Sequence, residues 1–366
     1  MRWLRWLPSA VVLGLLAFGP GGPSPESRIG GLASAAAFRL LDWETVNLAD
    51  RAGRLWHGLA GGVDLGEADA DALRAYFARQ TRTPSPSIEA ALERAVSQTY
   101  TRAGLSRSEP LLADRLFPPV LVALSAPPNV LVISPRTELR VAQSVVLQAL
   151  SPAAQEQLES SADSTGVSSL VAPIGGLATY PSMVLHEDAP ERVLASVAHE
   201  WLHQYLIFYP LGAGYWQRQE TREINETAAD LVGQEVGRSV AEDLGLQHPT
   251  GASPPPRPTG FDFRLFMRQT RLNTEHLLAA GKIEEAEAYM RAQRDELQRR
   301  GYQIRKLNQA YFALYGSYGE GFAASPTNPI PDLLRQLRNR SASLAEFIFR
   351  VRGVTTVSEL RAASPA

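Results

Sequence analysis

One short stretch constrains this 366-residue chain more than any other, because it places a His-Glu-x-x-His motif inside an apolar run. The motif is formed by His199, Glu200 and His203. We expect Asp188 to cap the start of a helix here, since a proline and a glutamate follow it at the spacing of a capping box. Apolar residues recur every three or four positions, which predicts that this helix is buried in the middle of a domain; they are Val193, Leu194, Val197, Trp201, Leu202, Tyr205 and Leu206.

The two histidines of such a helix are one turn apart and face the same side. Two imidazoles at this spacing can bind one metal ion, while Glu200 faces a water on the metal rather than the metal itself. The alternative is an ordinary helix whose two histidines lie in solvent or in the core. The chain has no cysteine, so any metal must be bound by histidine and carboxylate.

A second segment supplies the carboxylates that a metal site needs. Glu226 follows His203 by 23 residues, which leaves room for a turn and the start of an antiparallel helix. Asp230 lies one helical turn beyond Glu226, so one carboxylate can contact the metal while the other orients a histidine. From Glu223 the same aspartate would be two turns away, about 10 Å along the axis. The spacing therefore favours Glu226 as the third ligand; the alternative is a solvated acidic helix start.

The two segments together resemble the gluzincin metallopeptidases, the zincin clan that includes thermolysin. The family pattern is His-Glu-x-x-His followed later by Asn-Glu-x-x-x-Asp, which is matched here by Asn225, Glu226 and Asp230. The match covers about residues 188–235, and the surrounding chain also resembles predicted bacterial metallopeptidases. The resemblance implies an α+β fold, with a zincin-like catalytic unit built from a small mixed β-sheet and two zinc-bearing helices, and a mainly helical C-terminal half.

The resemblance also implies a reaction on a peptide or protein substrate. His199, His203 and Glu226 would bind Zn²⁺, which activates a water, and Glu200 would act as general base in peptide-bond hydrolysis. The rival is a non-catalytic, zinc-stabilised exported protein that serves as a binding or scaffold module. Structural zinc sites usually have four protein ligands, whereas three ligands and a well-placed glutamate favour an enzyme.

Further residues take roles by resemblance. Asp230 would orient the ring of His199, and Asn225 would lie just behind the metal ligands. The segment 176–184 is the expected edge strand for an extended substrate, although an ordinary sheet strand is an equal alternative. The gluzincin exopeptidase motif Gly-x-Met-Glu-Asn does not precede the motif helix, which disfavours that aminopeptidase group and leaves endopeptidases and other aminopeptidases open.

A tyrosine from the C-terminal half is a further expectation. Zincins often use a tyrosine or histidine there to stabilise the tetrahedral oxyanion. We expect Tyr315 in this role, with Tyr311 and Tyr318 as its neighbours, and core-packing tyrosines are the alternative.

The N-terminus predicts export. Arg2 and Arg5 precede an apolar run that ends at a Pro- and Gly-rich stretch. We expect residues 1–19 to be a signal or anchor segment and residues 20–37 to be a linker. An uncleaved anchor would hold an extracytoplasmic catalytic part at the cell membrane, and a secreted form is the alternative. The net charge of −2 disfavours a nucleic-acid partner.

The remaining pattern predicts three parts: an N-terminal helical segment at 38–117, the zincin-like core at 118–245 and a C-terminal helical subdomain at 246–366. Five prolines predict a loop at 247–260. Helices are expected at 38–59, 69–80, 88–103, 152–161, 261–279, 282–301, 303–318 and 343–351. Strands are expected at 120–124, 130–134, 168–173 and 177–185.

Overall fold

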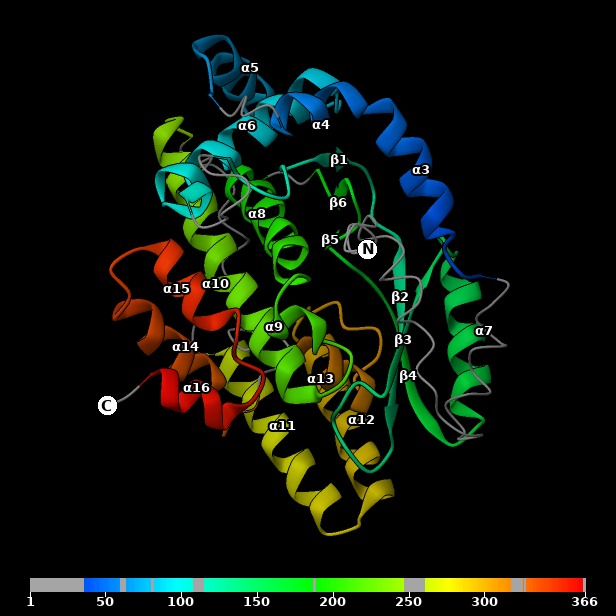
Figure 1. The fold of residues 1–366 in the computed structure, drawn as a ribbon. Coiled ribbons are helices and arrows are strands. Elements are labelled where there is room, and N and C mark those ends of the chain that lie inside the picture. Colours follow the sequence, from blue (N-terminus) through cyan, green and yellow to red (C-terminus); the bar gives the residue numbers. More distant parts are fainter. Residues whose placement is uncertain are drawn as a thin grey trace, which may run out of the picture.

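The computed structural model describes residues 36–59, 64–79, 82–107, 115–186, 189–246, 261–316, 325 and 327–364. These residues form two small three-stranded sheets and many helices (Figure 1). The expected α+β class and the helical C-terminal half are confirmed. The segments predicted as a membrane anchor at 1–19 and as a loop at 247–260 lie outside the described residues. No helix in the described ranges is long and apolar enough to cross a membrane.

The N-terminal helices are α3 (Leu40–Asp50), α4 (Ala52–Leu59), α5 (Glu67–Ala78) and α6 (Pro86–Arg102), followed by a 3-10 turn at Leu105–Arg107. The single helix expected at 38–59 is divided at Arg51. The guanidinium of Arg51 donates to both carboxylate oxygens of Glu89 and to the carbonyl oxygen of Val122. Through these hydrogen bonds, the point where α3 ends and α4 begins is held against α6 and against the first sheet.

The first sheet has the order β1-β6-β5 and is mixed, as expected. Strand β1 (Val122–Leu124) runs parallel to β6 (Ser182–Val184), and β5 (Gly176–Leu177) pairs antiparallel with β6. The strand expected at 177–185 is thus two short strands. Sheet pairing leaves β5 at one end of this order, so it is an edge strand within the described part of the chain.

The second sheet is antiparallel, with the order β3-β2-β4. Its strands are β2 (Asn129–Pro135), β3 (Gln143–Leu147) and β4 (Val167–Pro173). The short connection between β1 and β2 therefore joins two different sheets. Strand β3 has no counterpart in the expected pattern, because its residues are mostly half-buried and its apolar run is only three residues long.

Helices cover both faces of the second sheet. They are α7 (Pro152–Asp163) on one face and α11 (Phe263–Ala279), α12 (Ile283–Arg299) and α13 (Gln309–Gly316) on the other. Alternate side chains of β2 point to opposite faces. Val130 and Val132 therefore join the cluster with α11–α13, while Leu131 and Ile133 join the cluster with α7.

The motif lies on α8 (Pro190–Leu206), which leads through the short α9 (Pro210–Ala213) to α10 (Gln219–Asp243). The expected cap of α8 is wrong: the N-cap residue is Ala189 with no side-chain cap, and Asp188 lies outside the described residues. Pro190 occupies the first helical turn, where its missing N–H costs nothing. The C-terminal helices are α14 (Ile330–Asn339), α15 (Leu344–Val351) and α16 (Val357–Ala363).

The largest hydrophobic core surrounds α8. It contains Leu92 of α6, Leu202 of α8, Val232 of α10 and Phe347 of α15, each fully buried. Helices from all three predicted parts of the chain thus share one core with the motif helix. The boundaries at 117 and 245 stay predictions, but this core fixes α8 and α10 from both sides.

Candidate metal centre

Helices α8 and α10 lie side by side and carry the site (Figure 1). Their close approach depends on glycine. A Cβ on Gly233 would lie 2.7 Å from the carbonyl oxygen of Ala195 and 3.1 Å from Cβ of His199. A Cβ on Gly237 would lie 2.7 Å from the backbone nitrogen of Ala195. Glycine at both positions therefore lets the α10 backbone come near enough for Glu226 to reach the histidines.

Replacing Gly233 with alanine is expected to lower the free energy of unfolding by about 1–3 kcal/mol, because the added methyl overlaps the α8 backbone. Gly53→Ala is the matched control, since a Cβ there meets nothing within 4 Å. Alanine in that exposed helical position should instead raise the free energy of unfolding by about 0.5–1 kcal/mol. Urea denaturation measures both changes, and equal stability of Gly233→Ala and the parent chain would contradict the close packing.

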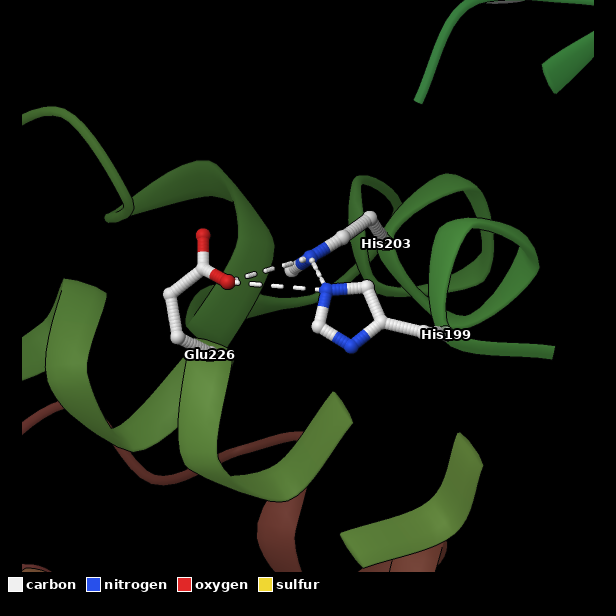
Figure 2. A group of neighbouring side chains, drawn as sticks. All are labelled: His199, His203 and Glu226. Carbon is white, nitrogen blue, oxygen red and sulfur yellow. Dashed lines mark hydrogen bonds and ion pairs between the residues drawn. The ribbon is translucent and has the colours of Figure 1, made fainter. Parts of the chain in front are cut away.

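Three potential ligand atoms converge between the two helices. The Nε2 atoms of His199 and His203 are 2.9 Å apart. The Oε2 atom of Glu226 lies 3.5 Å from the first nitrogen and 3.6 Å from the second. Figure 2 shows the two rings of α8 and the carboxylate of α10 pointing toward one another. Because one ligand atom from each residue lies within 4.8 Å of the others, this group could hold a metal ion.

The far nitrogens of both rings are fixed by acceptors. Nδ1 of His199 lies 3.1 Å from a carboxylate oxygen of Asp230. Nδ1 of His203 lies 2.7 Å from Oδ1 of Asn225, whose Nδ2 donates to the carbonyl oxygen of Leu211. Each Nδ1 therefore carries a proton, and in a neutral ring this leaves a lone pair on Nε2. Two lone pairs facing each other need a positive charge between them, which a proton or a metal ion supplies.

Glu226 offers one free oxygen to the same point. Its Oε1 accepts a hydrogen bond from the hydroxyl of Tyr215, while the buried Oε2 has no hydrogen-bond donor in the described structure. Burial opposes ionisation of Glu226, but the two histidines outweigh burial and hold the pKa of this carboxyl group well below its ordinary value. An ionised, buried oxygen without a hydrogen-bond donor, next to the Nε2 atoms of two histidines, fits a cation.

The carboxylates also act on the histidines. Burial lowers the pKa of His199, but Asp230 and Glu226 outweigh it and raise this pKa well above its ordinary value. The point between the two histidines and Glu226 is therefore strongly attractive to positive charge. A divalent ion would neutralise Glu226 and Asp230 together, whereas a single proton would not.

Glu200 lies against the edge strand of the first sheet. Burial raises the pKa of its carboxyl group, although His199 and His203 oppose the rise. Its side chain has no hydrogen bond or ion pair within the ranges that the structure describes. A Cβ on Gly176 would lie 2.9 Å from Cδ of Glu200, so a side chain at this point of β5 would displace the carboxylate. The carboxylate thus lies against the backbone of β5.

Glu223, the competing acid, lies outside the group of three. Its carboxylate accepts hydrogen bonds from the side-chain amides of Gln219 and Asn328. Burial raises the pKa of Glu223, in the opposite direction to that of Glu226. The structure therefore brings together the residues that the spacing argument chose: Glu226 with the histidines, and Asp230 behind His199.

The tyrosine that contacts the group is Tyr215, in the connection between α9 and α10. Burial raises the pKa of its hydroxyl well above the ordinary value, so the hydroxyl stays protonated and can donate to Glu226. Its ring meets the ring of His203 edge to face, with centroids 6.0 Å apart. The sequence signal was only a Tyr-Trp pair in a connection rich in glycine and polar residues, which sets no direction for the side chain.

Tyr315 lies on α13, in the cluster that covers the second sheet. Its ring packs against that of Tyr311, with centroids 4.6 Å apart, and Tyr318 lies outside the described residues. Burial raises the pKa of Tyr315, with Arg305 opposing the rise. Its role at the oxyanion stays a prediction.

Comparisons with protein-family models, curated proteins and solved structures gave no match to this chain. The function must therefore be argued from the sequence and structure of this chain alone. The structure shows a mostly helical α+β fold and a group of two histidines and one glutamate that could hold a metal ion.

Proposed function

We propose that this protein is a zinc-dependent peptidase with a zincin-like catalytic unit and Glu200 as its general base. The observation that carries the proposal is the convergence of the two Nε2 atoms of His199 and His203 and the Oε2 atom of Glu226. Asp230 and Asn225 fix the rings from behind. This is the arrangement that the resemblance to gluzincins implies.

The donor set suits zinc better than the common alkaline-earth ions. Calcium and magnesium prefer oxygen ligands, whereas two imidazole nitrogens and one carboxylate oxygen form a known catalytic zinc set. The same donors also occur in non-haem iron oxygenases. Glu200, next to a ligand and without a hydrogen bond in the described structure, favours hydrolysis over oxygen chemistry. When bound, zinc acts as a Lewis acid that makes water a better nucleophile near neutral pH.

Each of the neighbouring residues would then have its own role in the hydrolysis. Glu200 takes a proton from the water as its oxygen attacks the peptide carbonyl carbon, and passes that proton to the leaving amine as the C–N bond breaks. Asp230 and Asn225 keep each Nδ1 protonated and each Nε2 available. Tyr215 holds Oε1 of Glu226, which leaves Oε2 for the metal.

The substrate would lie along β5 as an extra strand. Gly176 belongs to this edge strand and contacts Glu200, so a peptide paired there passes beside the general base. The expected location outside the cytoplasm, through an N-terminal anchor or after secretion, is part of the proposal and rests on the sequence of residues 1–19. The expected partner is a peptide or protein substrate.

The test is metal-dependent cleavage of a peptide library by the full-length chain in detergent. Cleavage is expected to disappear after treatment with a chelator and to return when Zn²⁺ is added back. Cleavage that survives complete metal removal would contradict the proposal. Tight zinc binding without cleavage of any peptide would instead favour the non-catalytic, zinc-stabilised module.

A further inference from the structure

Arg222 lies next to the metal-ligand group but is not part of it. It stands one turn before Glu226 on α10, so both residues face the same side of the helix. Its guanidinium carbon lies 5.3 Å from the ring centroid of Tyr215 and 4.9 Å from that of Trp216. Because the Tyr215 hydroxyl donates to Glu226, one side chain separates the guanidinium from a metal ligand.

Other partly buried arginines of this protein pair with carboxylates in a two-pronged manner. Arg94 does so with Asp69, and Arg338 with Glu235. Arg222 forms no ion pair in the part of the chain that the structure describes, and its buried Nε has no hydrogen-bond acceptor there. A guanidinium has five N–H donors in a planar fork that matches a carboxylate. Within the described residues, the guanidinium of Arg222 is thus held in place without an acceptor for its buried Nε–H.

The nearest acids of α10 are already engaged. Glu223 accepts from Gln219 and Asn328, and Glu226 accepts from Tyr215 and faces the histidines. The ring faces of Tyr215 and Trp216 restrain the Arg222 side chain without neutralising its charge. Trp216 itself is 39% exposed, which is unusual for a tryptophan and leaves this platform open to a ligand.

We propose that Arg222, supported by Tyr215 and Trp216, forms a subsite that binds a carboxylate group of the substrate. The inference rests on the proposed peptidase function and narrows its substrate class. The carboxylate can be the free C-terminus of a peptide or the side chain of an aspartate or glutamate. Either would form paired, charge-assisted hydrogen bonds to the guanidinium fork.

A purely structural role for Arg222 makes a different prediction. If the arginine only offsets the charge of Glu223 and Glu226, its removal would change metal affinity and would affect all peptides alike. A carboxylate subsite would instead change the preference between peptides that differ in one carboxylate. The decisive readout is therefore a ratio of affinities, measured alongside zinc content.

The experiment uses the full-length chain with Glu200→Gln, loaded with zinc, so that peptides bind without turnover. Isothermal titration compares a peptide ending in a free acid with its C-terminal amide, and an internal aspartate with asparagine. We expect at least one acid to bind about tenfold or more tightly than its neutral partner. Arg222→Gln should abolish the preference and Arg222→Lys should keep part of it, because the charge remains while the fork is lost.

Arg218→Gln is the matched control. It removes the same charge one turn earlier, from the exposed residue at the N-cap of α10, and should leave the preference unchanged. A preference for the free C-terminus would indicate a carboxypeptidase-type subsite, and one for aspartate an acid-specific endopeptidase. The subsite would be overturned if peptides with the carboxylate and their neutral counterparts bound equally tightly. It would also be overturned if Arg222→Gln lowered the affinity for both kinds of peptide by the same factor. Selective binding by a chain that cleaves no peptide would support the subsite while refuting the peptidase function.

Discussion

The Glu200→Gln variant is expected to keep its fold and its zinc but to lose peptide hydrolysis by roughly 10²–10⁴-fold in kcat. The amide has the shape of the carboxylate but cannot accept the proton of the attacking water. The fit should be preserved, because glutamine keeps the size and shape of the glutamate side chain where it lies against Gly176 of β5. Initial rates on the best peptide of the library, together with zinc content, measure both expectations.

The control for this variant is Glu191→Gln, which changes an acid in the first turn of the same helix, away from the metal ligands. It should retain nearly full activity. If Glu200→Gln turned over substrate at close to the parent rate while Glu191→Gln did as well, proton transfer by Glu200 would be excluded from the mechanism.

The second large effect concerns the third metal ligand. Glu226→Ala should weaken zinc binding by more than the roughly 10–100-fold that loss of an orienting partner costs, because a direct ligand is removed. Glu223→Ala, three residues earlier on the same helix, should leave zinc affinity nearly unchanged. Its carboxylate contacts Gln219 and Asn328, and none of its contacts reaches the histidines.

The zinc affinity of Asp230→Ala is expected to lie between those of Glu226→Ala and Glu223→Ala. The metal should stay bound but with an affinity lowered by about 10–100-fold, because Nδ1 of His199 loses its acceptor. Competition with a chromophoric chelator gives all three affinities on one scale. Severe zinc loss in Glu223→Ala together with unchanged binding in Glu226→Ala would show that the ligand assignment is wrong.

The parts of the site that follow from helical spacing could be predicted from the sequence. A turn of helix fixes His199 relative to His203, and another fixes Glu226 relative to Asp230, whatever surrounds them. The distance between the two helices depends on tertiary contacts. Gly233 and Gly237 allow the close approach, yet a glycine in a helical pattern does not reveal which helix it meets.

Features set by connections were harder to predict. Tyr215 reaches Glu226 because the chain turns after α9, and no periodicity reports such a turn. Helix α14 was not predicted, because the prolines at its start suggest a loop. Proline is nevertheless tolerated in the first turn of a helix. Helix α16 begins with a capping box of Thr356 and Glu359, a local signal that the sequence does contain.

Local sequence patterns also do not show that distant segments of the chain share one hydrophobic core. Leu92 and Phe347 both contribute to the core around α8, although more than 250 residues separate them in the sequence. An apolar stripe on a helix predicts that a face is buried but not the partner that covers it. For this reason the sequence divides the chain into three parts while the packing joins their helices.

The central claim is that His199, His203 and Glu226 bind a catalytic zinc ion. Anomalous X-ray diffraction at the zinc absorption edge, on crystals of the zinc-supplemented protein, tests it most directly. We predict a single zinc peak about 2.0–2.2 Å from both Nε2 atoms and from an oxygen of Glu226, with a fourth position not filled by a protein ligand. Well-folded protein without a zinc peak between α8 and α10, or with zinc enclosed by four protein ligands, would contradict the claim.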